Sequence, residues 1–532
     1  MRNKFYNHIV RLLFPCVAFS AITGFLAAIL VTLFKIMAEW VLRASACAYE
    51  AVRAKPIWLP IIVIAVALIG FAQSLLLSTS HSCKGGGIPT SVAAIKGILS
   101  FRWTSGIFLL PLSALLTFLA GLPLGTEGPC VQMGTAVGDG VIKSLGKEKH
   151  KGWRRYIMTG GASAGFSIAT ASPVSAIIFA MEEIHKHFSP ILLSVASISV
   201  ITAQITSKAL ASIGIGEVGF FHLPKIQALP TVLFFAPLLL GLVSGVFSIL
   251  FTRLYHHIDR IMRTILKRFS AKIVLPILFS VVSIVGFFFA DTLGSGDSLI
   301  SSLFSANSAW YLLILLLLIR AIGMILCNTS GATGGIFLPT LTFGAIIGSL
   351  CANVMISLGW IGEEYYLLMV VLGITSFLGS TSRIPLTACV FAIEALSGIN
   401  NVLPIVISTI VALLIVEASG LEDLTDKVID AKLHKVTKGK TPFDVEVSLT
   451  VNPNSFVVGK ELRDVLWPNS CVVVAFKRAK PSKKYSVISE GDVITVKYVT
   501  YDPSATTKEL NDLVGEQTEQ IIQIMNPCED HT

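Results

Sequence analysis

The stretch GLPLGTEGP, residues 121–129, decides how this sequence is understood. It follows the apolar run GIFLLPLSALLTFLA (106–120) and places a single carboxylate, Glu127, among three glycines and two prolines. Neither helix propensity nor apolar packing requires an acid at this point. The reason for Glu127 therefore has to come from its surroundings.

The composition predicts a polytopic membrane protein. Of the 532 residues, 53% are hydrophobic and only 14% are charged, and the mean hydropathy is +0.76, whereas soluble domains carry roughly 25% charged residues. Long apolar stretches, near the ~20 residues that span a bilayer, lie at 9–35, 57–78, 104–122, 189–212, 229–252, 272–291, 308–327 and 335–358. Shorter or interrupted stretches lie at 161–182, 365–379, 385–396 and 403–417.

The distribution of charge predicts the orientation. The N-terminal MRNKFYNHIVRLL has no clear cleavage site, and we expect it to be a retained cytoplasmic end. Basic residues at 143–156, 253–272 and 432–440 would also face the cytoplasm. The net charge of +9 is then a matter of topology. A nucleic-acid partner is disfavoured, because no basic cluster is interleaved with aromatic residues on a soluble module.

Cofactor chemistry finds little support in the sequence. The nine cysteines are scattered singly, without CxxC or Cys/His spacing, and predict neither a disulfide framework nor a metal site. We expect no cofactor. His185, His187, His256 and His257 lie where apolar runs give way to charge and are interpreted as interface residues.

The composition changes after about residue 440. Short β-branched runs alternate with turn signals, as in a small β-rich soluble domain. The segment from SFVVGKELRDV to SEGDVITV (455–496) resembles the TrkA-C regulatory module of bacterial transport proteins. We expect a membrane domain at 1–430, a linker at 431–442, this module at 443–502 and a polar tail at 503–532. Such modules bind small ligands or dimerise, and the sequence leaves both open.

Glycine and proline predict three helix breaks in the membrane part. They are KGGGIPT (84–90), GLPLGTEGP and SGATGGIFLP (330–339). The glycines at the cores of these motifs are Gly85, Gly86, Gly87, Gly125, Gly128, Gly334 and Gly335. Non-helical backbone at membrane depth is tolerated where it is buried in protein or lines a cavity. Each motif ends in a proline suited to the first turn of a following helix. Free N–H groups at such helix starts form an anion site.

This setting gives Glu127 a function. When ionised, its carboxylate competes for the donors that would hold a free anion, and when protonated it can leave them. One side chain would then act as both gate and proton carrier. The alternative is that Glu127 only caps its helix, although acids inside membranes are rare and usually functional.

A second pair of carboxylates ends the small-residue-rich segment 154–188. Glu182 and Glu183 lie there beside His185 and Lys186, where acids often form only interfacial ion pairs. The charges Arg320, Arg383 and Glu394 lie within apolar context and are interpreted mainly as buried structural partners.

Several motifs together resemble the CLC chloride channels and transporters. GGGIP (85–89), GTEGP (125–129), FAMEE (179–183), GGIFLP (334–339) and SRIPLTACVFAIE (382–394) follow that family's order over about residues 10–430. The resemblance implies an all-α membrane domain of two inverted repeats with many tilted and partial helices, followed here by the small β-rich α+β domain. It also implies a non-enzymatic homodimer in a lipid bilayer, with both termini cytoplasmic, in the inner membrane of a bacterium.

The resemblance also assigns residues. Backbone N–H groups of Ile336 and Phe337 would hold the central anion, with a contribution from Gly86. Glu127 falls on the gating glutamate and Glu183 on the inner proton-transfer glutamate of the exchangers. Because passive channels of the family usually have a neutral residue at the inner position, Glu183 favours chloride/proton antiport.

Three departures from the family pattern concern anion binding. Gly86 stands where exchangers commonly have serine and nitrate-preferring members proline, and Thr126 stands where the family usually has arginine or lysine. The anion-coordinating tyrosine aligns with Thr425, which the resemblance therefore places among the anion-binding residues. Loss of two hydroxyl ligands predicts weaker central anion binding and looser coupling, since each charge-assisted hydrogen bond contributes about 1.5–3 kcal/mol.

Other functions stay open at this stage. A passive or weakly coupled chloride channel is the first alternative. A transporter of another anion, fluoride or nitrate, is a more distant alternative, and GGGIP disfavours fluoride. A cation transporter is suggested only by the C-terminal module and is opposed by helix N-termini that repel cations. An intramembrane serine protease would need a mid-membrane histidine beside GASAG (161–165), and small residues that pack helices explain this motif better.

Overall fold

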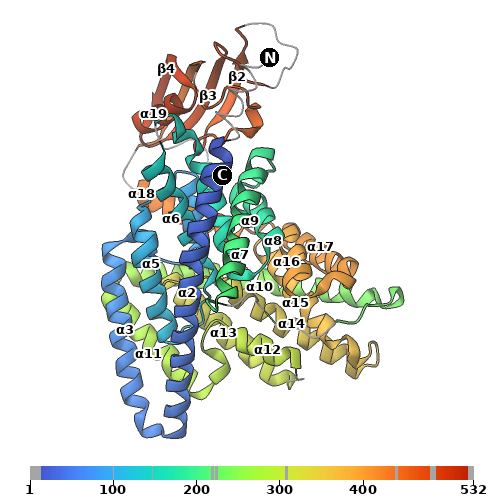
Figure 1. The fold of residues 1–532 in the computed structure, drawn as a ribbon. Helices are drawn as coiled ribbons and strands as arrows, with labels where there is room; N and C mark the ends of the chain where they lie inside the picture. The colour runs from blue at the N-terminus through green and yellow to red at the C-terminus, as the bar shows by residue number, and fades with distance from the viewer. Residues whose placement is uncertain are drawn as a thin grey trace.

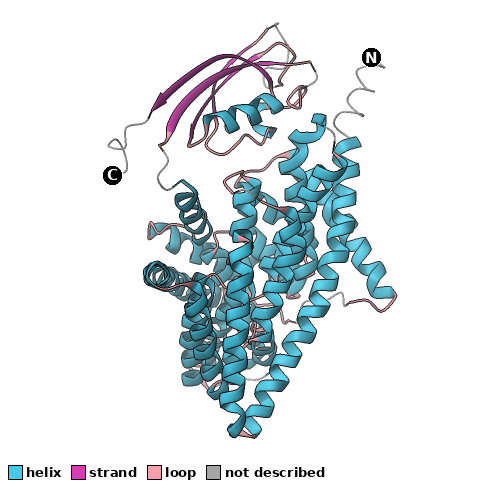
Figure 2. Ribbon diagram, turned by 90° about the vertical axis from the view of Figure 1, so that its left-hand side faces the viewer, coloured by secondary structure: helices cyan, strands magenta, loops and turns pink. Residues whose placement is uncertain are grey.

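The computed structural model describes residues 14–524 except 100, 147, 217–220, 222–225, 306–308, 438–440, 454 and 480–486. The expected cytoplasmic N-terminal end, 1–13, lies outside the described residues. A large helical domain carries a small β domain at one end (Figure 1; Figure 2). Within the described ranges, nine helices are long and apolar enough to cross a membrane.

The helical domain contains the same order of long and short helices twice. The first half comprises α2 (Phe14–Ala54), α3 (Leu59–Thr79), α4 (Ile88–Ile95), α5 (Trp103–Leu119), α6 (Glu127–Leu145), α7 (Arg154–Thr170), α8 (Pro173–Phe179) and α9 (Pro190–Ser212). The second half comprises α10 (Phe235–Arg268), α11 (Ala271–Phe288), α12 (Asp297–Ser305), α13 (Trp310–Ser330), α14 (Phe337–Ser357), α15 (Tyr366–Thr381), α16 (Pro385–Ala395) and α17 (Val402–Ala418). In each half the first helix packs against the last, and α6 packs on α7 as α14 packs on α15.

One expectation about the helices needs correction. The first span was expected at 9–35, but α2 continues to Ala54. Its interior Lys35 donates to the carbonyl oxygens of Ile168 and Ala169 at 3.1 and 3.2 Å, which satisfies a charge that would otherwise end a span. The helix α6 was not among the expected spans and is not one of the nine candidate spans, because Asp139, Lys143 and several glycines dilute its hydropathy.

Two glutamates tie the short helices of the halves together reciprocally. Glu182, just after α8, accepts bonds of 2.9 and 2.7 Å from the first N–H groups of α16. Glu394, near the end of α16, accepts two bonds of 2.9 Å from the first N–H groups of α8. Glu182 is therefore a helix cap and not an ion-pair partner of His185 or Lys186. Glu394 is a structural partner, as the sequence suggested.

The C-terminal domain is an antiparallel sheet with the strand order β2-β3-β1-β4. Its strands are β1 (Phe443–Val451), β2 (Val472–Lys477), β3 (Val493–Thr500) and β4 (Gly515–Ile524), and α19 (Pro503–Leu513) precedes the last of them. Residues of β1 are buried in alternation, which is the pattern of a sheet with one covered face. The expected module ended at 502, whereas β4 pairs along the whole of β1 and carries the domain to residue 524.

The two domains are connected by α18 (Leu424–Thr437), which covers part of the segment expected to be a linker at 431–442. The β domain contacts the start of α7 directly. Phe456 packs against Trp153 and Tyr156, with ring centroids 5.3 and 5.6 Å apart. Arg155 forms a 2.7 Å ion pair with Glu509. Aromatic packing and a charge pair thus hold the sheet against the helical domain.

Candidate functional site

The three glycine-rich breaks meet in the middle of the helical domain. Gly125 and Gly335 exchange two backbone hydrogen bonds of 2.8 and 2.7 Å, which join the break before α6 to the break before α14. The N–H of Gly85 donates to the carbonyl oxygen of Gly331 at 3.3 Å. The loop before α4 therefore joins the same cluster, and three motifs that are far apart in the sequence form one structure.

Glycine is required where these loops touch through their backbones. A Cβ on Gly128 would lie 2.1 Å from the carbonyl oxygen of Gly86. A Cβ on Gly87 would lie 2.2 Å from the carbonyl oxygen of Gly128, and Gly87 also has a φ of +77°. Such distances are far inside van der Waals contact, so neither position accepts a side chain.

Each break leads into the N-terminus of a helix. Pro89, Pro129 and Pro339 lie in the first turns of α4, α6 and α14, as the sequence predicted. The first N–H groups of these helices have no partner within their own helix, and the helix dipole gives that end a partial positive charge. Convergence of these ends forms an environment suited to an anion.

Glu127 is the first residue of α6, and its side chain is only 1% exposed. The hydroxyl of Thr126 donates to its Oε1 at 3.1 Å, and no described residue hydrogen-bonds to its Oε2. A cavity of about 240 Å³, lined also by Lys35 and Asp297, reaches this carboxylate. A buried acid with one unpartnered oxygen at the end of a cavity can alternate between two positions or two protonation states.

The residues expected to bind the anion lie close to the start of α6, where Glu127 is placed. Ile336 immediately precedes α14 and Phe337 begins it, so their N–H groups are at the free end of that helix. The ring of Phe337 is fixed between Phe166 and Phe391, with ring centroids 5.2 and 5.7 Å away. Gly86 lies beside Gly334, whose carbonyl oxygen would be 3.8 Å from a Cβ on Gly86.

Glu183 lies in a π-helical turn, Ala180–His185, that follows α8. Its side chain is 3% exposed, and the hydroxyl of Thr425 donates to its Oε1 at 2.6 Å. The structure thus pairs Thr425 with the expected proton-transfer residue. Its expected contact with the anion stays a prediction.

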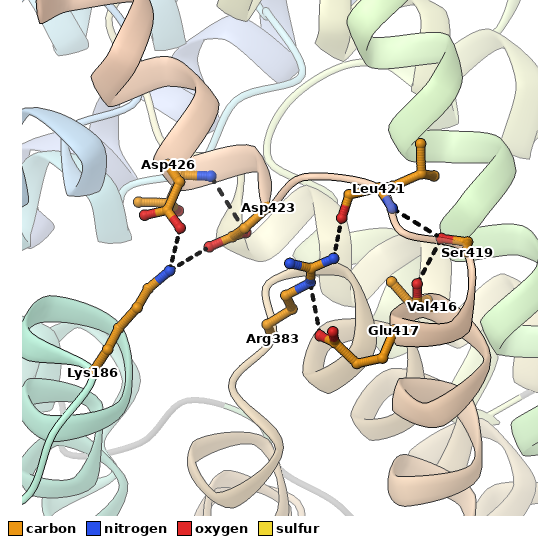
Figure 3. A network of polar contacts seen from close by, with 9 residues as sticks. Lys186, Arg383, Val416, Glu417, Ser419, Leu421, Asp423 and Asp426 are labelled. Atoms are coloured by element: carbon orange, nitrogen blue, oxygen red, sulfur yellow. Dashed lines mark hydrogen bonds and ion pairs between the residues drawn. The ribbon is translucent and has the colours of Figure 1, made fainter. Parts of the chain in front are cut away.

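A polar network lies next to this pair, between α8 and the start of α18 (Figure 3). Lys186 bridges Asp423, at 3.4 Å, and Asp426. Arg383 pairs with Glu417 at 3.0 Å and donates to the carbonyl oxygen of Leu421. The sequence analysis did not identify this network, although acids directly after the last apolar run could have indicated it.

The buried Arg320 has a structural role. The guanidinium of Arg320 donates to backbone carbonyl oxygens of the segment 291–294, at 3.0 Å for Gly294 and 3.3 Å for Leu293. It therefore fixes the segment before α12, in agreement with its expected structural role.

Asn328, in the last turn of α13, is a residue of this site that the sequence analysis missed. Its Oδ1 accepts a 2.7 Å hydrogen bond from Tyr255, and its Nδ2 lies beside Gly86. No motif pointed to it, because it precedes the glycine-rich break. Among the described residues, no group of three His, Cys, Asp or Glu side chains is arranged to hold a metal ion.

The comparison with protein families agrees with this geometry. The model described as voltage gated chloride channel matches residues 69–417. A chain named H(+)/Cl(-) exchange transporter ClcA from Vibrio campbellii is 28% identical over 437 residues, which cover 79% of this chain and 90% of the relative. The protein of the same name from Klebsiella pneumoniae strain 342 is 27% identical, with coverage of 78% and 88%.

Solved structures share the fold. A slow cyanobacterial Cl-/H+ antiporter superposes with a TM-score of 0.72 at 22% identity, over 80% of this chain and 99% of that chain. A CLC-type fluoride/proton antiporter gives a TM-score of 0.61 at 21% identity, over 76% and 96%. The mostly helical architecture with partial helices expected from the sequence is therefore confirmed.

Proposed function

Because this chain belongs to the voltage-gated chloride channel family, as the match over residues 69–417 establishes, we propose that it exchanges chloride for protons across a membrane. The observation that carries this proposal is the placement of Glu127. Its buried carboxylate begins α6, beside the breaks that lead into α4 and α14. An ionised carboxylate there occupies the place of an anion, and protonation releases it.

The names of the relatives support chloride/proton exchange. The proteins of Vibrio campbellii and Klebsiella pneumoniae are both named as H(+)/Cl(-) exchange transporters. Transport of another anion, fluoride or nitrate, stays the more distant alternative, and the loop GGGIP disfavours fluoride.

Glu183 separates an exchanger from a passive channel. A channel needs no second buried acid, whereas an exchanger needs a proton donor on the side opposite the gate. Glu183 is 3% exposed and is held by Thr425, in contrast to Glu182, which is used as a helix cap. Two adjacent acids with different partners favour a dedicated proton-transfer role for Glu183.

The functional unit would be a homodimer. The helices α9 and α17 carry large apolar side chains on their outer surface, with Ile201 and Ile205 55% and 65% exposed and Leu403 and Leu414 64% and 61% exposed. Such surfaces suit either a second copy or lipid. A dimer in the inner membrane of a bacterium, with both termini in the cytoplasm, is the arrangement we propose.

The C-terminal domain would serve as a regulatory module of the TrkA-C type. A cavity of about 760 Å³ lies between it and the helical domain. Lysine and arginine side chains dominate its charged lining, which comprises Lys143, Lys151, Arg154, Arg155, Lys508, Glu509 and Asp512. Its size is that of a small-molecule site, and the excess of cations favours an anionic ligand.

Proteoliposomes with a chloride gradient and no proton gradient test the exchange directly. We expect uphill proton movement in the wild type, loss of this movement in Glu127→Gln and Glu183→Gln, and continued chloride flux in Glu183→Gln. Chloride flux without proton movement in any of the three proteins would identify a channel instead.

A further inference from the structure

At Gly86 the proposed anion site lacks a side-chain ligand. Gly86 has no hydroxyl to offer, although exchangers of this family commonly have serine there. The backbone itself does not require glycine at this position, because Gly86, unlike Gly85 and Gly87, lies outside the left-handed region. The space beside Gly86 is therefore open to another group of the structure.

That group is Asn328. A Cβ on Gly86 would lie 3.3 Å from Asn328 Nδ2, which is tighter than ordinary van der Waals contact, and the next neighbours would be 3.8 and 3.9 Å away. The amide of Asn328 thus occupies the space into which a side chain at position 86 would project. It comes from the end of α13, shortly before the break that leads to Ile336.

The amide is oriented with its donors toward Gly86. The Tyr255 hydroxyl donates to Asn328 Oδ1 at 2.7 Å, which uses the acceptor of the amide and leaves its NH₂ group directed elsewhere. Asn328 is 9% exposed, and no described residue accepts a hydrogen bond from Nδ2. A buried donor without a partner costs about 1–3 kcal/mol, so its presence beside the proposed anion path calls for a ligand.

We propose that Asn328 is an anion-binding residue, whose side-chain amide donates to the transported anion in place of a hydroxyl at position 86, and that Tyr255 positions it. This inference rests on the proposed transport function. An amide N–H is a neutral donor, like a serine hydroxyl, and it binds an anion without adding a positive charge that would hold the anion too tightly. Asn328, on α13, would thereby replace the side-chain donor that Gly86 lacks.

Chloride binding to the full-length protein, measured by isothermal titration calorimetry in chloride-free detergent solution, tests this assignment. Asn328→Leu removes one hydrogen bond to the anion, and we expect chloride affinity to weaken about tenfold. A tenfold change corresponds to ~1.4 kcal/mol. Asn328→Asp keeps the shape and the acceptor for Tyr255 but replaces the donor with a carboxylate, and we expect a larger loss. Tyr255→Phe should give a smaller loss, because it frees the amide to rotate.

Two further variants keep the test falsifiable. Asn400→Leu, at an exposed asparagine before α17, should leave chloride affinity unchanged. In Gly86→Ser combined with Asn328→Ala the serine gains the space of the amide, and we expect affinity to recover to within about threefold of the wild type. Thermal unfolding of each protein identifies misfolded variants, and recovery in the double variant excludes a general folding defect.

The possible outcomes distinguish the role of Asn328 from the proposed transport function. Wild-type affinity in folded Asn328→Leu and Asn328→Asp would overturn the role of Asn328 while leaving the transport function intact. Absence of chloride binding by the wild type itself would count against the proposed function, and with it against this inference. Loss in both variants with recovery in the double variant would establish the assignment.

Discussion

The hydroxyl of Thr425 donates a 2.6 Å hydrogen bond to Oε1 of Glu183, across 242 residues of sequence. This bond joins the first turn of α18 to the π-helical turn after α8. Lys186, three residues beyond Glu183, binds Asp423 and Asp426 on either side of Thr425 (Figure 3). The position of the Glu183 carboxylate is therefore set by α18 as well as by its own helix.

Thr425→Val removes this donor and keeps the shape of the side chain. A hydrogen bond to a charged group contributes about 1.5–3 kcal/mol, so we expect proton transport in proteoliposomes to slow by roughly tenfold or more. Chloride flux should continue. Thr425→Ser, which keeps the hydroxyl, is the matched control. An equal fall of chloride and proton flux in Thr425→Val would indicate that the residue acts on the anion path instead.

The adjacent glutamates offer a second contrast. Glu182→Gln weakens the bonds to the first N–H groups of α16, and we expect a loss of stability of about 1–2 kcal/mol with coupling preserved. Glu183→Gln should abolish proton transport with little change in stability. Thermal unfolding and transport of both variants check this. Loss of coupling in Glu182→Gln at full stability would contradict the separation of roles.

The glycine cluster predicts a contrast between neighbours. In Gly128→Ala the new Cβ would lie 2.1 Å from the Gly86 carbonyl oxygen and 2.8 Å from Gly335 Cα. Backbone cannot move there without separating two breaks, so we expect little or no monodisperse protein in size-exclusion chromatography. In Gly86→Ala the tightest approach is 3.3 Å, to the end of the Asn328 side chain, and this variant should be recovered in normal yield. Similar yields for the two variants would show that these loops are not packed as described.

The sequence was sufficient for the features that depend on local pattern. The apolar runs located most of the long helices, the proline after each glycine-rich break located the starts of α4, α6 and α14, and the position of Glu127 at one such start followed from the same motif. Each of these rests on residues within one short window. Local hydropathy and the backbone preferences of glycine and proline are therefore enough to predict them.

Features that depend on distant partners were not accessible in this way. The reciprocal caps by Glu182 and Glu394 join helices about 200 residues apart, and nothing beside either glutamate indicates its partner. The same holds for β4, whose pairing with β1 moved the end of the domain, and for Asn328, which is made relevant only by the absence of a side chain at Gly86. Polarity alone does not reveal such pairings.

Lys460 lies buried where the β domain meets the helical domain. Its side chain is enclosed by aromatic rings, with Nζ 3.0 Å from the ring centroid of Phe456 and 5.1 Å from that of Trp153. The residue is 4% exposed, and Nζ also donates to the Phe456 carbonyl oxygen. Burial lowers the pKa of Lys460 to about 7, and nearby Cys16 opposes the shift. The charge is thus costly in the docked state.

Docking of the β domain should therefore strengthen with rising pH. Between pH 7 and the usual lysine pKa of about 10.4, the undocked state binds a proton that the docked state lacks, so docking gains up to ~1.4 kcal/mol per pH unit. Below pH 7 both states are protonated and docking is weakest. The rate of subtilisin cleavage between α18 and β1 should fall from pH 7 to pH 9 in the wild type. Each rate is divided by that of Lys460→Met at the same pH, because this ratio removes the pH dependence of the protease itself. An identical pH profile in both proteins would mean that Lys460 does not titrate on docking.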